Sequence, residues 1–199
     1  MIILGLVFIL ITIRQVGRFS FKIWQVMLAG AILALLTGEI SPGDAVHAIN
    51  PGVMLFLLGM FIVGEGVKSS GLLEDCIDWI CSHATSGDML LLLVTWTMGL
   101  LSAVLMNDTI AIIGAPLILV LAGRFGVSKP GAMIALCFSV TTGSVFSPIG
   151  NPQNYLIASY VTDMSPYLLF LSGLCIPTMF SLFVIHIFLR PFFKGAKIP

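Results

Sequence analysis

The 199-residue chain is 58% hydrophobic and only 9% charged, with a mean hydropathy of +1.11 and a formal net charge of zero. Soluble domains carry about 25% charged residues, so this chain has too little polar surface to cover a soluble body, and we predict a multi-pass protein of the cell membrane. The zero net charge argues against a nucleic-acid partner. The sequence contains no P-loop, HExxH motif or nucleophile–base pattern, so we predict no enzyme activity.

The first third of the chain contains three apolar segments, of which the first is short. We predict three spans within residues 1–67: Met1–Ile13, Ile23 to about Thr37, and Pro51–Val67, whose first residue suits a first helical turn. The next segment, 72–82, has apolar residues at helical spacing with acidic residues among them. This pattern indicates a helix that lies in the membrane interface.

Residues 89–122 form two apolar runs with a polar interruption. Met89–Met106 is strongly apolar, Asn107-Asp108-Thr109 interrupts it, and Ile110–Ala122 resumes it for about a dozen residues, or roughly 20 Å of helix. That length is too short for about 30 Å of hydrocarbon. We therefore predict a re-entrant hairpin with a polar tip at depth. The alternative of two full spans leaves both ends on the same side of the membrane.

Residues 130–160 predict a broken helix. Pro130–Thr142 is about half a span, an irregular Gly/Pro/Asn-rich segment follows it, and Tyr155–Tyr160 is a short helix. Tyr167–Leu189 is a full last span. The predicted fold is therefore all-α: a single transmembrane domain, 1–199, with about five transmembrane helices, one re-entrant hairpin and one broken helix.

The basic residues predict the orientation. If the loop with Arg14, Arg18 and Lys22 is cytoplasmic, the predicted crossings place all nine basic residues in the cytoplasm. This agrees with the positive-inside rule. We predict an outside N-terminus and a cytoplasmic C-terminus.

The two polar interruptions are the candidate transport site. Irregular backbone persists in a membrane only against protein, water or a solute, and broken helices in transporters offer helix N-termini to anions and free carbonyls to Na⁺. We expect Asn107 or Asp108 to cap a helix that begins near Thr109, and Asn151 to cap one that begins at Pro152. The candidate substrate- and ion-binding residues are Asn107, Asp108, Thr109, Thr141, Thr142, Gly143, Ser144, Pro148, Gly150, Asn151, Pro152 and Asn154, with any Na⁺ expected at Asn107, Asp108 and Asn151.

Asp108 is the one acid expected deep in the membrane, where a charge is costly enough to indicate function. Its carboxylate can bind a coupling Na⁺ or carry a proton. The alternative is an aspartate that only caps a helix and is solvated by a cavity. Apart from Na⁺ or H⁺ as a coupling ion, we predict no cofactor.

The segments Met106–Thr109 and Ser147–Asn154 resemble those of the ion transporter superfamily, particularly ArsB-type arsenical pumps and citrate-transporter-like permeases. The whole chain is similar to the N-terminal half of such a permease. The resemblance implies two inverted repeats, each with a re-entrant hairpin and an unwound helix, and an elevator-type movement within a homodimer. The odd number of predicted crossings would invert a tandem duplicate, in agreement with that architecture.

These observations predict a secondary transporter that moves a small anion or a metalloid such as arsenite, coupled to H⁺ or Na⁺. One alternative is a citrate or dicarboxylate–cation symporter, and another is a non-transporting membrane subunit of a larger complex. The expected partners are the lipid bilayer and a second half-transporter chain or another copy of this chain. Any use of ATP would require a partner ATPase.

Overall fold

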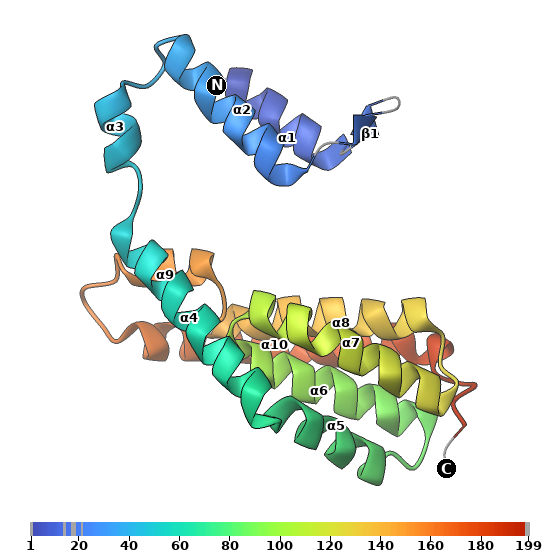
Figure 1. Ribbon diagram of the computed structural model, residues 1–199. Helices are drawn as coiled ribbons and strands as arrows, with labels where there is room; N and C mark the ends of the chain where they lie inside the picture. The colour runs from blue at the N-terminus through green and yellow to red at the C-terminus, as the bar shows by residue number, and fades with distance from the viewer. Residues whose placement is uncertain (1, 14, 17–18, 21, 198–199) are drawn as a thin grey trace. The chain divides into compact units, whose positions relative to one another are not determined.

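The computed structural model describes residues 2–13, 15–16, 19–20 and 22–197, and most of them are helical (Figure 1). The chain divides into two compact units, Met1–Pro51 and Gly52–Pro199. The all-α prediction is confirmed at this level. Among the described residues, the one β element is a short antiparallel pair of β1 (Gln15–Val16) and β2 (Phe19–Ser20) in the first unit.

The first unit is a pair of apolar helices, α1 (Ile2–Ile13) and α2 (Ile23–Leu36), followed by the short α3 (Pro42–His47). The two longer helices pack closely because α2 has a glycine, Gly30, against the Val7 side chain of α1. With 12 and 14 residues, α1 and α2 are about 18 and 21 Å long, shorter than the spans predicted there. The predicted cytoplasmic residues Arg14 and Arg18 lie outside the described residues.

The second unit is a helical bundle, and its first helix, α4, crosses beside the others (Figure 1). Its elements in chain order are α4 (Pro51–Ser70), α5 (Leu72–His83), α6 (Gly87–Leu105), α7 (Asn107–Phe125), α8 (Lys129–Gly143), the 3₁₀ turn η1 (Ser144–Phe146), α9 (Pro152–Ala158), α10 (Pro166–Leu189) and the 3₁₀ turn η2 (Arg190–Phe192). The helices predicted over 130–142 and 167–189 therefore form within one residue of their expected bounds.

Helix α6 is the centre of this bundle and packs against α5, α7, α8 and α10. Leu90, Leu91 and Met98 on α6 are fully buried. Helix α5 covers part of the core with a buried apolar stripe, Leu73 and Ile80 among it, and leaves its acidic side chains exposed. The amphipathic helix predicted over 72–82 is confirmed, while its place in the membrane interface stays a prediction.

Four described helices are long and apolar enough to cross a membrane: Pro51–Ser70, Gly87–Leu105, Asn107–Phe125 and Pro166–Phe192. The second arm of the expected hairpin is thus 19 residues, about 28 Å, and not a dozen. It is longer because the helix includes the polar residues at its start and Gly123–Phe125 at its end. The length argument for a re-entrant hairpin was therefore wrong, since either arm has nearly the length of a span.

Candidate substrate and ion site

The hairpin tip joins α6 to α7 through a single residue. Met106 lies between the two helices with a φ of 65°, a value that other non-glycine residues in the described chain do not adopt. Its side chain is fully buried, which holds it in this uncommon conformation. Helix α7 begins at Asn107, and its N-cap position, Met106, has no side-chain cap. The expected capping by Asn107 or Asp108 was therefore wrong: Asn107 Oδ1 accepts only the adjacent Asp108 N–H, at 2.8 Å.

The second break is the unwound segment between Gly143, where α8 ends, and Pro152, where α9 begins. Asn151 has extended backbone geometry, and its Oδ1 accepts the N–H of Asn154 at 2.8 Å. Pro152 occupies the first turn, where a missing N–H is harmless. The predicted cap at Asn151 is confirmed.

Asn154 ties the unwound segment together. Its Nδ2 donates to three carbonyl oxygens: Ser144 O at 3.1 Å, Val145 O at 3.1 Å and Ser147 O at 2.9 Å. A broken helix leaves such carbonyls without their usual helical partners, and here the Asn154 amide, together with the Ser147 N–H on Ser144 O and the Gly150 N–H on Ser147 O, occupies them. Carbonyls that we expected to be available to a cation are thus directed at Asn154.

The two breaks contact each other. The N–H of Asn107, at the hairpin tip, donates to Gly150 O of the unwound segment at 2.9 Å. Behind this contact, Asn151 Nδ2 donates to Ser144 Oγ at 3.4 Å, and Ser144 Oγ donates to Thr141 O at 2.9 Å. Asn107 and Gly150, 43 positions apart in the sequence, therefore belong to one continuous polar region.

Glycines permit this close approach. A Cβ on Gly143 would collide with the backbone of Gly99 in α6, and a Cβ on Gly150 would collide with the Ser144 backbone. On the other side of the tip, a Cβ on Gly64 of α4 would collide with Thr109 Cγ2. Gly64 and Gly99 were missed from the sequence, where a glycine inside an apolar helix was the only available signal.

The candidate residues differ in exposure. Asp108 and Thr141 are exposed, while Ser144 and Thr109 are buried, with 1% and 4% of their surface accessible. Gly143, Pro148 and Gly150 are also buried, whereas Asn107, Thr142, Asn151, Pro152 and Asn154 are half-buried. Thr109 Oγ1 has no hydrogen-bond partner, and no described residue forms an ion pair with Asp108. The region thus offers an unpaired carboxylate and a free hydroxyl beside fixed carbonyls and amides, a set of groups suited to a cation or to a hydroxylated solute.

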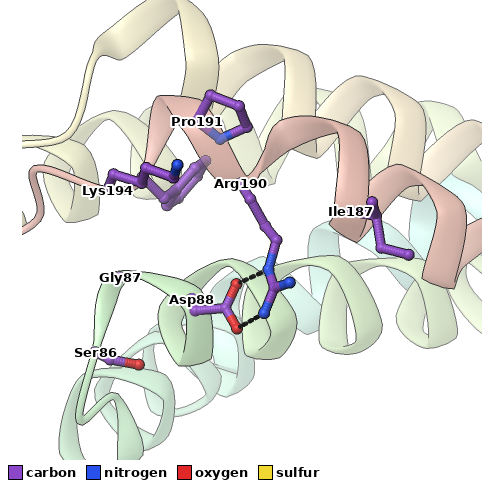
Figure 2. A pocket seen from close by; sticks show the side chains of 8 residues that line it. Ser86, Gly87, Asp88, Ile187, Arg190, Pro191 and Lys194 are labelled. Carbon is purple, nitrogen blue, oxygen red and sulfur yellow. Dashed lines mark hydrogen bonds and ion pairs between the residues drawn. The ribbon is translucent and has the colours of Figure 1, made fainter.

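A second polar cluster, which the sequence did not predict, lies where α6 begins and α10 ends (Figure 2). The Arg190 guanidinium donates through Nε and Nη2 to both oxygens of Asp88, and His186 Nε2 lies 3.4 Å from Asp88 Oδ1. The pair lines an open cleft of about 570 Å³, together with Gly87, Lys194 and others. Because Asp88 and Arg190 are 102 residues apart, no local pattern in the sequence signals their contact.

The chain matches a known protein family over nearly its whole length. Residues 6–199 match the model of a family described as "Citrate transporter". The chain belongs to the citrate transporter family. It is a family of membrane transporters and not of enzymes, in agreement with the resemblance and with the absence of enzyme motifs noted above.

Several curated transporters share modest identity with this chain. The silicon efflux transporter LSI3 of Oryza sativa subsp. japonica is 30% identical over 131 residues, covering 66% of this chain and 27% of the relative. An uncharacterized transporter of Mycobacterium tuberculosis is 24% identical over 167 residues, or 81% of this chain and 39% of the relative. The putative transporter arsB of Dictyostelium discoideum is 24% identical over 135 residues, covering 66% and 23%. The chain therefore spans well under half the length of these curated relatives. No solved structure matches it.

Proposed function

We propose that this chain forms half of an ion-coupled secondary transporter that moves a small anion or a metalloid such as arsenite. The observation that carries the proposal is the contact between the two polar breaks, Asn107 N–H to Gly150 O at 2.9 Å. Two helix interruptions that meet inside an apolar bundle create one polar region within the membrane, which is where secondary transporters bind their solutes. The candidate residues from Asn107 to Asn154 line this region.

Helix lengths support a hairpin tip that lies at depth. The Asp88–Arg190 pair holds the start of α6 and the C-terminal end of α10 at one level. From there α10 extends about 36 Å to Pro166, whereas α6 extends only about 27 Å to Met106. The tip then ends roughly 10 Å short of the far end of α10. On this basis we propose that α6 and α7 are a re-entrant hairpin beside the other crossings, although each has nearly the length of a span.

Basic residues at one end of the bundle support the predicted orientation. Lys197 N–H donates to Phe125 O at 2.7 Å, and the glycines Gly87 and Gly131 pack against η2 and the residue after it. These contacts gather Arg124, Lys129, Arg190, Lys194 and Lys197 at the same end. By the positive-inside rule this end is cytoplasmic, as is the C-terminus, and the N-terminus is outside.

Asp108 is the residue proposed to couple transport to an ion. It is exposed at the tip and has no described ion-pair partner, so its charge is available to H⁺ or to Na⁺. Asn107 and Asn151 supply further oxygens for a cation. The remaining contacts are proposed to come from a second half, carried by another polypeptide, a second copy or a longer chain, and a partner ATPase would supply any use of ATP.

A citrate or dicarboxylate–cation symporter is the second candidate function, favoured by the description of the matching family. The polar region offers hydroxyl and amide groups but no described basic side chain, which fits an uncharged or weakly acidic metalloid better than a trivalent anion. A non-transporting membrane subunit is a third candidate. In such a subunit the contact between the two polar breaks would have no function.

Uptake into proteoliposomes tests the proposal. Arsenite, citrate and ²²Na⁺ are supplied to the wild type, to Asp108→Asn and to the matched control Asp163→Asn, whose carboxylate is in an exposed loop. We expect uptake of one solute by the wild type and the control, and its loss in Asp108→Asn. Equal uptake by all three proteins would refute the role of Asp108. Absence of uptake even with a second half added would favour the non-transporting subunit.

A further inference from the structure

The buried polar atoms of the second unit are unevenly distributed. Five buried side-chain atoms in the described residues have no hydrogen-bond partner, and one of them is Thr109 Oγ1 at the hairpin tip. The other four belong to three helices that pack together, and they are Thr95 Oγ1 on α6, Ser139 Oγ on α8, and Thr178 Oγ1 and His186 Nδ1 on α10. Each of these four residues has at most 4% of its surface exposed. We call these four residues the polar seam.

The seam residues share one interface. On α6, Thr95 is seven residues after Asp88 and seven before Ser102, so all three project from one face of the helix. Asp88 faces His186 of α10, and Ser102 Oγ donates to Val140 O of α8 at 2.8 Å. The same face of α6 therefore meets both α10 and α8.

Contacts at Gly99, which lies between Thr95 and Ser102, bring the other two helices together. Leu182 of α10 and the carbonyl of Ser139 on α8 both pack against Gly99. Thr178 and His186 are each one turn from Leu182, so they lie on the same face of α10. The four unpartnered atoms thus follow the line along which α6, α8 and α10 meet.

This line runs from the Asp88–Arg190 cleft to the unwound segment after α8. At the first end, Asp88 and Arg190 line the cleft shown in Figure 2. At the other end, Gly143 packs on Gly99, and Ser144 next to it belongs to the polar break. The charged groups that face His186 are Asp88 and Arg190, and α8 contributes to the seam a hydroxyl only.

Buried polar atoms without partners are costly, and proteins usually satisfy them with internal water. A set of four along one interface provides a bound water with more than one partner. His186 adds a titratable group, because a neutral imidazole carries one N–H and one lone pair. It can accept a proton from seam water at Nδ1 and release its Nε2 proton to Asp88 or to water in the cleft, which conserves the proton count.

We propose that water fills the polar seam and that protons pass along it between the Asp88–Arg190 cleft and the polar break, with His186 as the group that exchanges them. The proton path rests on the proposed function, because it supplies the ion that drives transport. The water in the seam does not depend on that function.

Radiolytic labelling of Met98 tests the water. Met98 is fully buried, one turn from both Thr95 and Ser102, and hydroxyl radicals reach such a side chain only from bound water nearby. In the wild type we expect Met98 to be oxidised readily. We expect a severalfold slower oxidation in Thr95→Val/Thr178→Val and no change in Thr97→Val, a control on the same helix with a half-buried threonine. An unreactive Met98 in the wild type would overturn the proposal, as would equal oxidation in all three proteins.

Uptake measured against a pH gradient tests the proton path. We expect His186→Gln to lose most of the gradient dependence of uptake while the KM for the solute is unchanged. An unaltered gradient dependence would overturn the path even if Met98 is labelled. A wild type that takes up no solute would refute the proposed function alone, because Met98 labelling would still decide whether the seam holds water.

Discussion

The two ends of the α6–α8–α10 bundle are held together by different kinds of interaction. At the cytoplasmic end of the proposed orientation, opposite charges pair: Arg190 donates to both oxygens of Asp88. At the polar break, neutral groups make the contacts, and the one carboxylate, Asp108, has no described ion-pair partner. A paired charge stabilises the bundle but is not available to a ligand, whereas an unpaired one costs stability and is available. This difference supports the proposal that the solute binds at the break.

The largest stability effect is expected at Asn154, because its amide is the donor to three carbonyls. Asn154→Leu removes three hydrogen bonds at once, and each such bond contributes about 0.5–1.5 kcal/mol. We expect a large fall in the thermal unfolding temperature and faster proteolysis between residues 144 and 154. Gln153→Leu is the control, since Gln153 is exposed on the same helix. If both variants unfold at the wild-type temperature, Asn154 does not hold the break.

A smaller loss is expected from Gly143→Ala, which tests how closely the break approaches α6. The added Cβ would collide with the Gly99 backbone, and overpacking of this kind costs about 1–3 kcal/mol. The matched control is Gly173→Ala, because no atom lies near a Cβ added at Gly173. Thermal unfolding of both variants in the same detergent provides the measurement, and equal stability would show that α6 and α8 are further apart than described.

The smallest effect is expected at the charged end. Arg190→Lys keeps the charge but loses the two-pronged contact with Asp88, and both side chains are about half exposed. We expect a fall in unfolding temperature smaller than that of either glycine or asparagine variant, and one that shrinks as salt is added. Lys68→Gln, which removes the exposed Glu65–Lys68 pair, serves as the control and should change nothing measurable. An Arg190→Lys effect larger than that of Asn154→Leu would reverse the comparison between the two ends.

Much of the secondary structure could be predicted from local patterns. The helix over 166–189 follows from a long apolar segment without Asp, Glu, Lys or Arg, and the start of α9 follows from Asn151 and Pro152, a cap and a first-turn residue. The Glu65–Lys68 pair, three residues apart on one helix, is present at 3.3 Å. These features depend on residues within one or two helical turns.

The errors arose where tertiary contacts decide the structure. Helix α7 begins two residues earlier than expected because buried Met106 adopts a positive φ, which a sequence pattern favours only for glycine, asparagine or aspartate. The short α3 was not predicted, although Ser41 before Pro42 is a usable cap signal. The polar segments of the candidate site could be predicted because polar residues stand out in an apolar chain. The contact between these segments could not be predicted, because it joins two backbone groups, those of Asn107 and Gly150.

The central claim is that the two breaks form a single site, and solute protection of two engineered cysteines tests it most directly. Asp108→Cys reports on the hairpin tip and Gln153→Cys on the unwound segment, each in a chain whose four native cysteines are replaced and each at an exposed position. Labelling by a membrane-impermeant maleimide is followed in proteoliposomes with and without the transported solute. We expect that solute to slow labelling at both positions over the same concentration range. Protection at one position only, or at neither, would contradict a single site built from both breaks.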